Sequence, residues 1–200
     1  MTTIGVLMPT LPGREQMREQ ALDTFYKQVY PESWDVNILI DADPVLTLGS
    51  KINKMLERIT YELPCDFVVL FDDDDLHHPT RIRRQIEPML DDPNLTMTGT
   101  SVIVFRRHTT GEIFRYKGLS SRWIGGLAFP VSSWQKYKFQ DITVGTDTIW
   151  QRNFPIETRL DLKDESLMLC GIHAHNSSTK HTVGREWMQL PDVPNTLMGL

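Results

Sequence analysis

Three short apolar runs in the first half of the chain predict buried strands. They cover residues 4–8, 36–40 and 67–71. In each run almost every position is apolar, whereas a strand with one face in water alternates apolar and polar residues. The runs therefore suit strands that are covered by other elements on both faces.

The segments between these runs have the spacing of helices. Within residues 14–29, apolar side chains recur at every fourth position and so share one helix face: Met17, Ala21, Phe25 and Val29. Residues 50–62 carry a similar stripe, and Pro64 follows it. The order strand, helix, strand, helix, strand predicts an α/β unit with parallel strands. Right-handed crossovers then bring the loops after the strands to one sheet edge, where such folds bind ligands.

The second half of the chain is less regular. Its pattern predicts these elements: a helix over 81–90, a hairpin of 98–106 with 112–117, a short helix opening at 125–130, a helix over 146–152 and a strand over 167–172. No internal repeat or linker interrupts them. One mixed domain over residues 1–200 is the simplest interpretation, of the α/β class with a mostly parallel central sheet flanked by helices.

Composition narrows the possible classes of protein. The 200 residues include 21 Lys and Arg against 26 Asp and Glu, a formal charge of −5, which argues against nucleic-acid binding through bulk charge. No run approaches the roughly 18 apolar residues of a membrane helix, and the N-terminus lacks a signal-peptide pattern, so we expect a cytoplasmic protein. Cys65 and Cys170 stand in no zinc-binding pair, and a single disulfide between them stays open.

Four consecutive aspartates, residues 72–75, follow the third apolar run directly. Like charges this close repel one another unless a cation sits among them. Mg²⁺ and Mn²⁺ commonly take one or two carboxylates and complete their coordination with water and substrate phosphates. The run therefore predicts a divalent-metal site. The other interpretation is that carboxylates such as Asp75 cap the next helix or face solvent.

Two further polar loops should meet the aspartates at the same sheet edge. Pro9 and Thr10 follow the first strand, and Asp41 and Asp43 follow the second. Because the strands are expected to be parallel, their carboxyl ends lie together. This convergence is the first indication of a functional site.

The aspartate run and its surroundings resemble the DxD region of family-two glycosyltransferases, which have the GT-A fold. The similar segments follow one another in order between residues 4 and 176: Met8-Pro9-Thr10 with Arg14, Asp41 and Asp43, Gly49-Ser50-Lys51-Ile52-Asn53, Phe71-Asp72-Asp73-Asp74-Asp75-Leu76 with Pro79 and Arg81-Ile82, Gly125-Gly126 with Phe129, and Gly145-Thr146-Asp147. Two positions depart from the family. Ile52 stands where one subgroup has Arg in its Gly-x-Lys-Arg-Asn segment, and Thr146 stands where a Glu commonly precedes the catalytic Asp.

The resemblance implies a metal-dependent, inverting glycosyltransferase whose expected donor is a UDP-sugar. Residues 1–105 would hold the nucleotide sugar and residues 106–200 the acceptor. The nucleotide-sugar residues implied are Pro9, Thr10, Arg14, Asp41, Asp43, Lys51, Asn53, Asp72 and Asp73. The other roles implied are Mn²⁺ or Mg²⁺ binding by Asp74 and Asp72, acceptor binding by Gly125, Gly126 and Trp123, and general-base catalysis by Asp147.

A histidine near the C-terminus can complete the metal site in this family, often within a His-x-x-Asn segment. Residues 173–176 have that form. If residues 167–172 are a strand, His173 and His175 share one face, and both are candidate ligands, with His173 favoured by its spacing. The alternative is that both histidines only hydrogen-bond near a loop.

For the remaining polar and aromatic residues we expect structural roles, and for some of them a binding role is the alternative. His77 and His78 are expected in a loop, and the basic strip of Arg81, Arg83 and Arg84 is expected to be solvated or to hold an anionic acceptor. Residues 106–108 form a second basic strip with the same two interpretations. Trp134 is expected either to stack on a sugar or to lie in the core.

Two other functions stay open at this point. A nucleotidyltransferase would need a glycine-rich phosphate loop after the first strand, and residues 9–14 contain only one glycine. A domain that binds a nucleotide or carbohydrate without turnover is the second alternative. The acceptor is open among saccharides, proteins, small molecules and modified nucleic-acid bases, and a homo-oligomer is possible.

Overall fold

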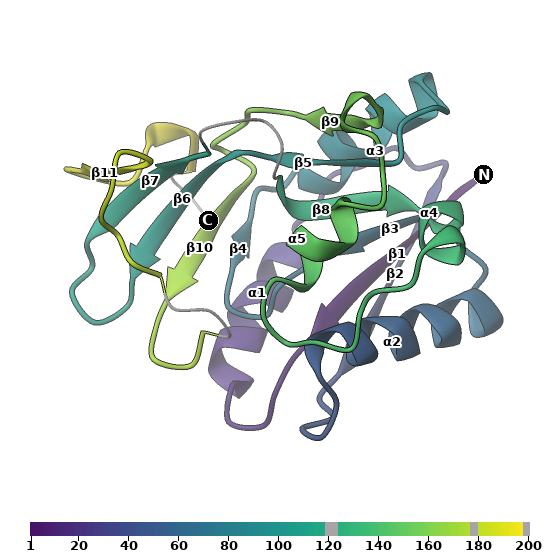
Figure 1. Ribbon diagram of the computed structural model, residues 1–200, viewed down its shortest axis with the longest axis horizontal. Coiled ribbons are helices and arrows are strands. Elements are labelled where there is room, and N and C mark those ends of the chain that lie inside the picture. The colour runs from purple at the N-terminus through teal and green to yellow at the C-terminus, as the bar shows by residue number, and fades with distance from the viewer. Residues whose placement is uncertain (119–123, 177–179, 198–200) are drawn as a thin grey trace.

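Two β-sheets lie side by side in the computed structural model, which describes residues 1–118, 124–176 and 180–197 (Figure 1). The larger sheet has the strand order β2-β1-β3-β8-β5-β9, and the smaller has the order β11-β7-β6-β10-β4. The strands of the larger sheet are β1 (Thr2–Pro9), β2 (Trp34–Asp41), β3 (Phe67–Leu70), β5 (Met97–Thr100), β8 (Gly125–Pro130) and β9 (Arg159–Asp161). Those of the smaller sheet are β4 (Leu76–His77), β6 (Val102–Arg107), β7 (Ile113–Lys117), β10 (Met168–Ile172) and β11 (Trp187–Leu190).

The helices lie between strands along the chain. They are α1 (Glu15–Tyr26), α2 (Leu48–Glu62), α3 (Arg81–Asp91), α4 (Val131–Lys136) and α5 (Thr146–Gln151), with 3-10 turns at Ile156–Thr158 and Asn195–Leu197. None of the helices in the described ranges combines the length and apolar character that a membrane-spanning segment needs.

The first three strands are parallel, as the apolar runs predict. β1 pairs in parallel with β2 and with β3, so that Val6 lies opposite Ile38 on one side and Val69 on the other. β8 then runs antiparallel to both β3 and β5, while β9 is parallel to β5. The α/β class is confirmed, with a sheet that is parallel in its N-terminal half and mixed beyond it.

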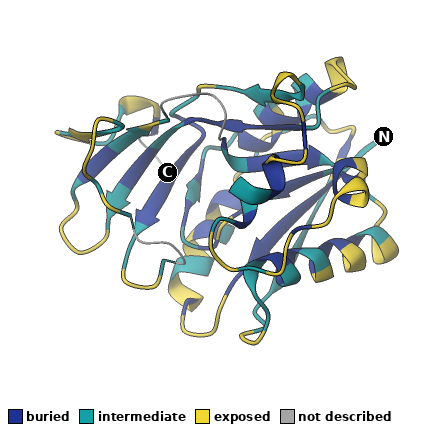
Figure 2. Cartoon of the chain, viewed as in Figure 1, coloured by how far each residue is buried: buried dark blue, intermediate teal, exposed yellow. Residues whose placement is uncertain are grey.

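Helices cover both faces of the larger sheet and form two separate cores. On one face α1 and α3 contribute Phe25, Ile82 and Ile86 to a cluster with Val6 and Phe71. On the other face, α2 packs with α4, α5 and the long loop between them around Trp134 and Trp150. Figure 2 shows the resulting buried strands and exposed outer helix faces. The continuous apolar strands of the sequence are explained by this double coverage.

Three boundaries differ from the sequence expectations. Residues 125–130 form β8 rather than the start of a helix, because this segment pairs with β3 and β5, and α4 begins only at Val131. The expected strand over 98–106 breaks after Thr100 into β5 and β6, which belong to different sheets. The first helix ends at Tyr26, and Val29 is exposed while its backbone N–H donates to the Pro79 carbonyl at 2.6 Å.

Other expectations hold. β6 and β7 form the antiparallel hairpin, and Trp134 is a core residue whose indole N–H donates to Asn53 Oδ1 at 2.9 Å. Cys65 and Cys170 are both free thiols, so the disulfide left open by their spacing is absent from the structure. The short strands β4, β9 and β11 have too few residues to show a pattern in the sequence.

Gly49, near the start of α2, lies against the loop that leads to α5. Its N–H donates to the Ile142 carbonyl at 3.0 Å, and a Cβ at this position would lie 1.8 Å from the Gln140 carbonyl oxygen. A side chain here therefore has no space unless the loop moves.

Replacing Gly49 with Ala should destabilise the protein by about 1–3 kcal/mol through overpacking. The usual effect of Gly→Ala inside a helix is a gain of roughly 0.5–1 kcal/mol, so the sign of the change is diagnostic. Urea unfolding of Gly49→Ala beside the exposed α2 variant Glu57→Ala measures it. A Gly49→Ala protein as stable as the parent would contradict this account of the contact.

Candidate functional site

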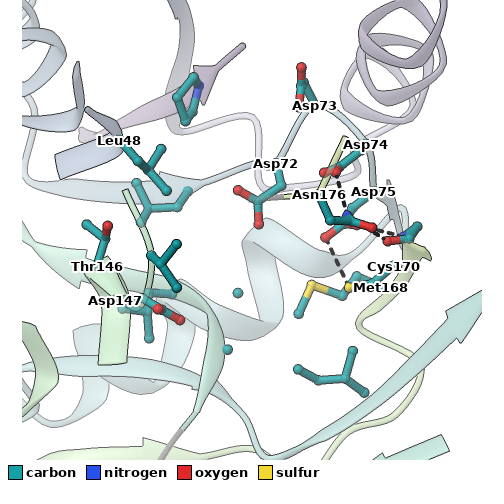
Figure 3. Close-up of a pocket in the computed structure, with 18 of the residues that line it drawn as sticks. Leu48, Asp72, Asp73, Asp74, Asp75, Thr146, Asp147, Met168, Cys170 and Asn176 are labelled. Atoms are coloured by element: carbon teal, nitrogen blue, oxygen red, sulfur yellow. Dashed lines mark hydrogen bonds between the residues drawn. The ribbon is translucent and has the colours of Figure 1, made fainter. Parts of the chain in front are cut away.

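A cleft of about 250 Å³ opens where the carboxyl ends of β1 and β3 meet the smaller sheet. Its lining comes from both halves of the chain: Pro9, Arg14 and Asp72 to Asp75 from the first half, and Gly125, Gly126, Asp147, Met168, Cys170, Gly171 and Asn176 among others from the second. Figure 3 shows the aspartates along one side and Asp147 on the other. The sheet edge predicted from the strand order is therefore the edge that carries the cleft.

The four aspartates point in different directions and have different partners. Asp73 is buried, accepts a hydrogen bond of 2.5 Å from the Thr10 hydroxyl and lies 3.1 Å from Arg14 Nη2. Asp75 is buried on the side of β10, where its oxygens accept from the Cys170 thiol and the Gly171 N–H, each at 3.0 Å. Asp75 is thus neither a helix cap nor solvated, contrary to the alternative considered for it.

Asp74 lies at the mouth of the cleft and gathers nitrogen donors. Its Oδ2 contacts Arg14 Nη2 closely, His173 Nε2 at 2.8 Å and Asn176 Nδ2 at 3.2 Å. These partners come from the loop after β1 and the segment after β10. One carboxylate oxygen therefore ties together three distant parts of the chain.

Asp72 points into the cleft and has an unusual proton affinity. Asp72 is exposed to solvent within the cleft. Protein atoms nevertheless surround its carboxylate and displace much of the water from it. This desolvation, together with the charge of Asp74, raises the pKa of Asp72 to about 7. Asp147 adds to the same effect, which places its charge within electrostatic reach of Asp72.

A buried arginine lies beneath the aspartate loop. Arg81 is 1% exposed, and its guanidinium donates to the Leu70 carbonyl at 2.7 Å, to Gln85 Oε1 at 3.0 Å and to His77 Nδ1 at 2.5 Å. Because Nδ1 accepts, the other ring nitrogen of His77 carries the proton and donates to the Asp72 carbonyl at 3.3 Å. The expectations of a solvated Arg81 and of a loop position for His77 are therefore wrong.

Burial affects the titration of this pair. It lowers the pKa of Arg81 to about 10, which leaves the guanidinium charged at neutral pH. It also lowers the pKa of His77 well below the ordinary value, and the adjacent Arg81 charge acts in the same direction. His77 is consequently neutral and serves as a hydrogen-bond bridge between Arg81 and the backbone of the aspartate loop.

Asp147 enters the cleft from the start of α5. Gly145 precedes the helix with a φ of 72°, a conformation that favours glycine and turns the chain into the helix. The Asp147 carboxylate accepts from the Thr148 N–H at 2.7 Å and otherwise faces the cavity (Figure 3). Thr146, which replaces the family's usual Glu, is buried and donates to the Ile142 carbonyl at 3.0 Å.

Two of the residues expected to bind the nucleotide sugar make hydrogen bonds to the loops around the site. Lys51 is buried and donates from Nζ to the Thr10 carbonyl at 2.5 Å, and burial lowers its pKa. The Asn53 amide donates to the Phe139 carbonyl and accepts from the Trp134 indole and the Phe139 N–H. Both side chains therefore brace the segments that carry Thr10 and Asp147.

Asp41 and Asp43 lie at the end of β2, outside the lining of the cleft. Lys54 Nζ lies 3.3 Å from Asp41 and 3.2 Å from Asp43. Asp41 also accepts from the Asp43 N–H at 2.8 Å. The two carboxylates form a separate, half-buried polar corner of the same sheet edge.

The structure distinguishes the two C-terminal histidines. His173 lies against Asp74, whereas His175 is exposed and only its backbone N–H bonds back to His173 Nδ1, at 3.1 Å. Across the described ranges, no three His, Cys, Asp or Glu side chains converge as a complete metal-binding set. Asp74 and His173 are the pair brought into contact, and Arg14 occupies the space beside them.

The residues expected on the acceptor side are placed as follows. Gly125 and Gly126 line the cleft, whereas Trp123 lies outside the described residues. Sequence reasoning missed a set of apolar side chains that also line the cleft, here called the apolar wall: Ile103, Phe105, Leu127, Val144 and Met168. It also missed Asn176 and Cys170 as partners of the aspartates, although Asn176 was visible as the end of the His-x-x-Asn segment.

No protein-family model and no curated protein sequence matches the chain. Solved structures do. Staphylococcus aureus TarS 1–349 in complex with UDP-GlcNAc superposes with a TM-score of 0.63 at 11% identity over 91% of this chain and 62% of that one. The same protein in complex with UDP gives 0.59 at 11% identity over 86% and 61%.

A third similar structure is the mannosyltransferase PcManGT from Pyrobaculum calidifontis in complex with GDP-Man and Mn²⁺, with a TM-score of 0.55 at 14% identity over 84% of this chain and 56% of that one. The chain thus spans about three-fifths of the length of these structures. At such low identity the likeness shows the fold, and it confirms the GT-A type of α/β architecture expected from the sequence.

Replacing Asp72 with Asn should stabilise the metal-free protein increasingly as the pH rises from about 4 to about 7. The folded protein holds the Asp72 proton with a pKa of about 7, against an ordinary value of 3.8. Ionising this carboxyl therefore opposes folding, and the opposition grows between the two pKa values. Asn is neutral and nearly isosteric, so it avoids this penalty.

Urea unfolding of both proteins in EDTA across this pH range measures the difference. A difference in unfolding free energy that stays constant, or that falls as the pH rises, would show that Asp72 does not retain its proton.

Proposed function

We propose that this protein transfers a sugar from a nucleoside-diphosphate sugar to an acceptor hydroxyl, with a UDP-sugar as the donor and a divalent cation as cofactor. The observation that carries the proposal is the cleft itself. Asp72 and Asp74 lie on one side of it and Asp147 on the other, at the ligand-binding edge of a GT-A fold. Support for the donor comes from the similar structures, which hold UDP, UDP-GlcNAc or GDP-Man.

The donor set suits Mn²⁺ or Mg²⁺. Asp74 offers a carboxylate in contact with the His173 imidazole at 2.8 Å, and Asp72 adds a second carboxylate within the same cleft. One or two carboxylates are what these ions commonly take from a protein when substrate phosphates supply further ligands. When bound, the ion would neutralise the negative charge that develops on the departing nucleoside diphosphate.

The chain's own residues would perform the remaining steps. Asp147 would remove the proton from the acceptor hydroxyl while the acceptor oxygen bonds to the anomeric carbon. The bond from that carbon to the diphosphate oxygen breaks in the same step, so the configuration inverts and the electron pair leaves with the nucleoside diphosphate. The apolar wall of Ile103, Phe105 and Met168 would exclude water and contact apolar faces of the sugar or acceptor.

Residues 1–200 would act as one catalytic unit. The first half would bind the donor, and the second half would contribute Asp147 and the acceptor side. Two features argue against the alternatives. The loop after β1 contains a single glycine and ends in Arg14, whereas a nucleotidyltransferase would need a glycine-rich phosphate cradle. A binding domain without turnover would have no use for a carboxylate placed like Asp147.

Nucleotide binding should depend on the divalent cation and on Asp74. Calorimetry with UDP, GDP and CDP, each with and without Mn²⁺, should give one metal-dependent nucleotide, with UDP expected. Asp74→Asn should weaken that binding by at least about tenfold because it removes a charged ligand. Asp91→Asn, which removes an exposed carboxylate at the end of α3, should bind like the parent. Failure of all three nucleotides to bind in either condition would rule out the donor assignment.

Asp147→Asn should separate binding from catalysis. Loss of the general base is expected to slow sugar transfer by about 10²–10⁴-fold while the donor dissociation constant stays within about twofold. Transfer assays beside calorimetry measure both quantities, and the exposed variant Glu157→Gln serves as the charge control. An equal loss of transfer and donor binding would refute the role of Asp147 as base.

A further inference from the structure

Arg14 holds a position in the cleft that a bound cation would need. It precedes α1 and is 8% exposed, so its charge is almost fully withdrawn from bulk water. Its Nη2 lies 3.1 Å from Asp73 Oδ1 and contacts Asp74 Oδ2 more closely still. The guanidinium therefore neutralises Asp74, which faces the proposed donor site, together with its buried neighbour Asp73.

Asp74 Oδ2 has more nitrogen neighbours than it has lone-pair sites to accept hydrogen bonds. Its Oδ2 faces Arg14 Nη2, His173 Nε2 at 2.8 Å and Asn176 Nδ2 at 3.2 Å, although a carboxylate oxygen offers about two lone-pair sites. Arg14 Nη2 also lies only 3.4 Å from His173 Nε2. A divalent ion bound by Asp74 and His173 would overlap the guanidinium, so the two cations exclude each other.

Arg14 also has an unused hydrogen-bond donor. Its Nε is buried and has no partner among the described residues. A buried donor without an acceptor is unfavourable, and guanidinium groups pair with phosphate oxygens through two parallel hydrogen bonds. Because Arg14 lines the cleft, a diphosphate bound there could accept from this nitrogen.

We propose that Arg14 is an exchangeable internal cation: it neutralises Asp73 and Asp74 in the metal-free protein, and a divalent ion displaces it toward the diphosphate of the donor. This inference rests on the proposed function for the identity of its second ligand. It makes Arg14 a binding residue with two alternative partners.

Coupling between the two ligands follows from this exchange. The ion alone must break the contacts of Arg14 with Asp73 and Asp74, and nothing replaces them. When a nucleoside diphosphate is present, its phosphates give the displaced guanidinium new acceptors. Ion and nucleotide therefore each strengthen the binding of the other, by the same factor in both directions.

The test compares Arg14→Gln with Arg18→Gln, which removes the same charge one turn further along α1 and so measures the long-range electrostatic effect. Without nucleotide, Arg14→Gln should bind Mn²⁺ at least about fivefold more tightly than the parent and clearly more tightly than Arg18→Gln. With saturating Mn²⁺, the same variant should bind UDP about tenfold more weakly, since a charged hydrogen-bond donor is lost. The two affinities are thus expected to change in opposite directions.

A second measurement is made on the unmodified protein, and a variant is needed only to assign the signal. The Nε–H NMR signal of Arg14, assigned by its loss in Arg14→Lys, should shift when Mg²⁺ is titrated. The signal of Arg81, which is enclosed beneath the aspartate loop, should move much less.

The outcomes separate the inference from the proposed function. Mn²⁺ binding by Arg14→Gln that equals or falls below that of Arg18→Gln, or an Arg14 signal unchanged at Mg²⁺ saturation, overturns the exchange. Absence of saturable Mn²⁺ binding in every protein also overturns it. Tighter Mn²⁺ binding by Arg14→Gln without UDP binding by any protein supports the exchange of cations while refuting UDP as the nucleotide of the donor.

Discussion

Four consecutive aspartates lie side by side at the end of a central strand. Their mutual repulsion is the constraint on which the rest of the structure depends. Unscreened, these carboxylates would repel one another at the point where the two sheets meet. Arg81 supplies a buried positive charge beneath them, and Arg14 supplies a second at the cleft. Asp75 relies on the Cys170 thiol and the Gly171 N–H instead. Cationic side chains and hydrogen-bond donors of the protein thus offset part of the repulsion among the four aspartates.

Accommodating Arg81 determines how the two halves of the chain join. A Cβ at Gly126 would lie 3.1 Å from Arg81 Nη2 and 2.5 Å from the Met168 methyl group, and the φ of 61° at this position also favours glycine. The glycine lets β8 pass close over the arginine, where the Gln85 side-chain amide donates to the Gly126 carbonyl at 2.6 Å. β8 also pairs with β3, the strand that leads into the aspartates. The strand that lines the cleft is therefore hydrogen-bonded to the strand that carries the aspartates.

The two walls of the cleft have opposite chemistry, and this contrast connects the fold to the proposed reaction. One wall carries carboxylates and a guanidinium, with the His173 imidazole against Asp74, and these groups suit an ion and a diphosphate. The other is formed largely by apolar side chains from β6, β8 and β10, which would limit water around the reacting atoms of the proposed transfer. Asp147 stands apart from the aspartate loop, on a short helix whose approach is held by Asn53 and Gly49 of α2. In the proposed reaction, donor binding and proton transfer would therefore depend on separate residues.

The sequence by itself determined the alternation of β1, α1, β2, α2 and β3, because double-sided burial and helical spacing are properties of neighbouring residues. It also indicated that the aspartate run and the loops after β1 and β2 meet at one sheet edge, and the family resemblance added the His-x-x-Asn segment to the metal site. Only the tertiary structure decided that residues 125–130 insert as a strand between β3 and β5, that Arg81 and Lys51 are buried, and that His173 rather than His175 meets Asp74. That last contact joins residues 99 positions apart. Which charges are buried and which partners they find depends on segments distant in the chain, and no local pattern contains that information.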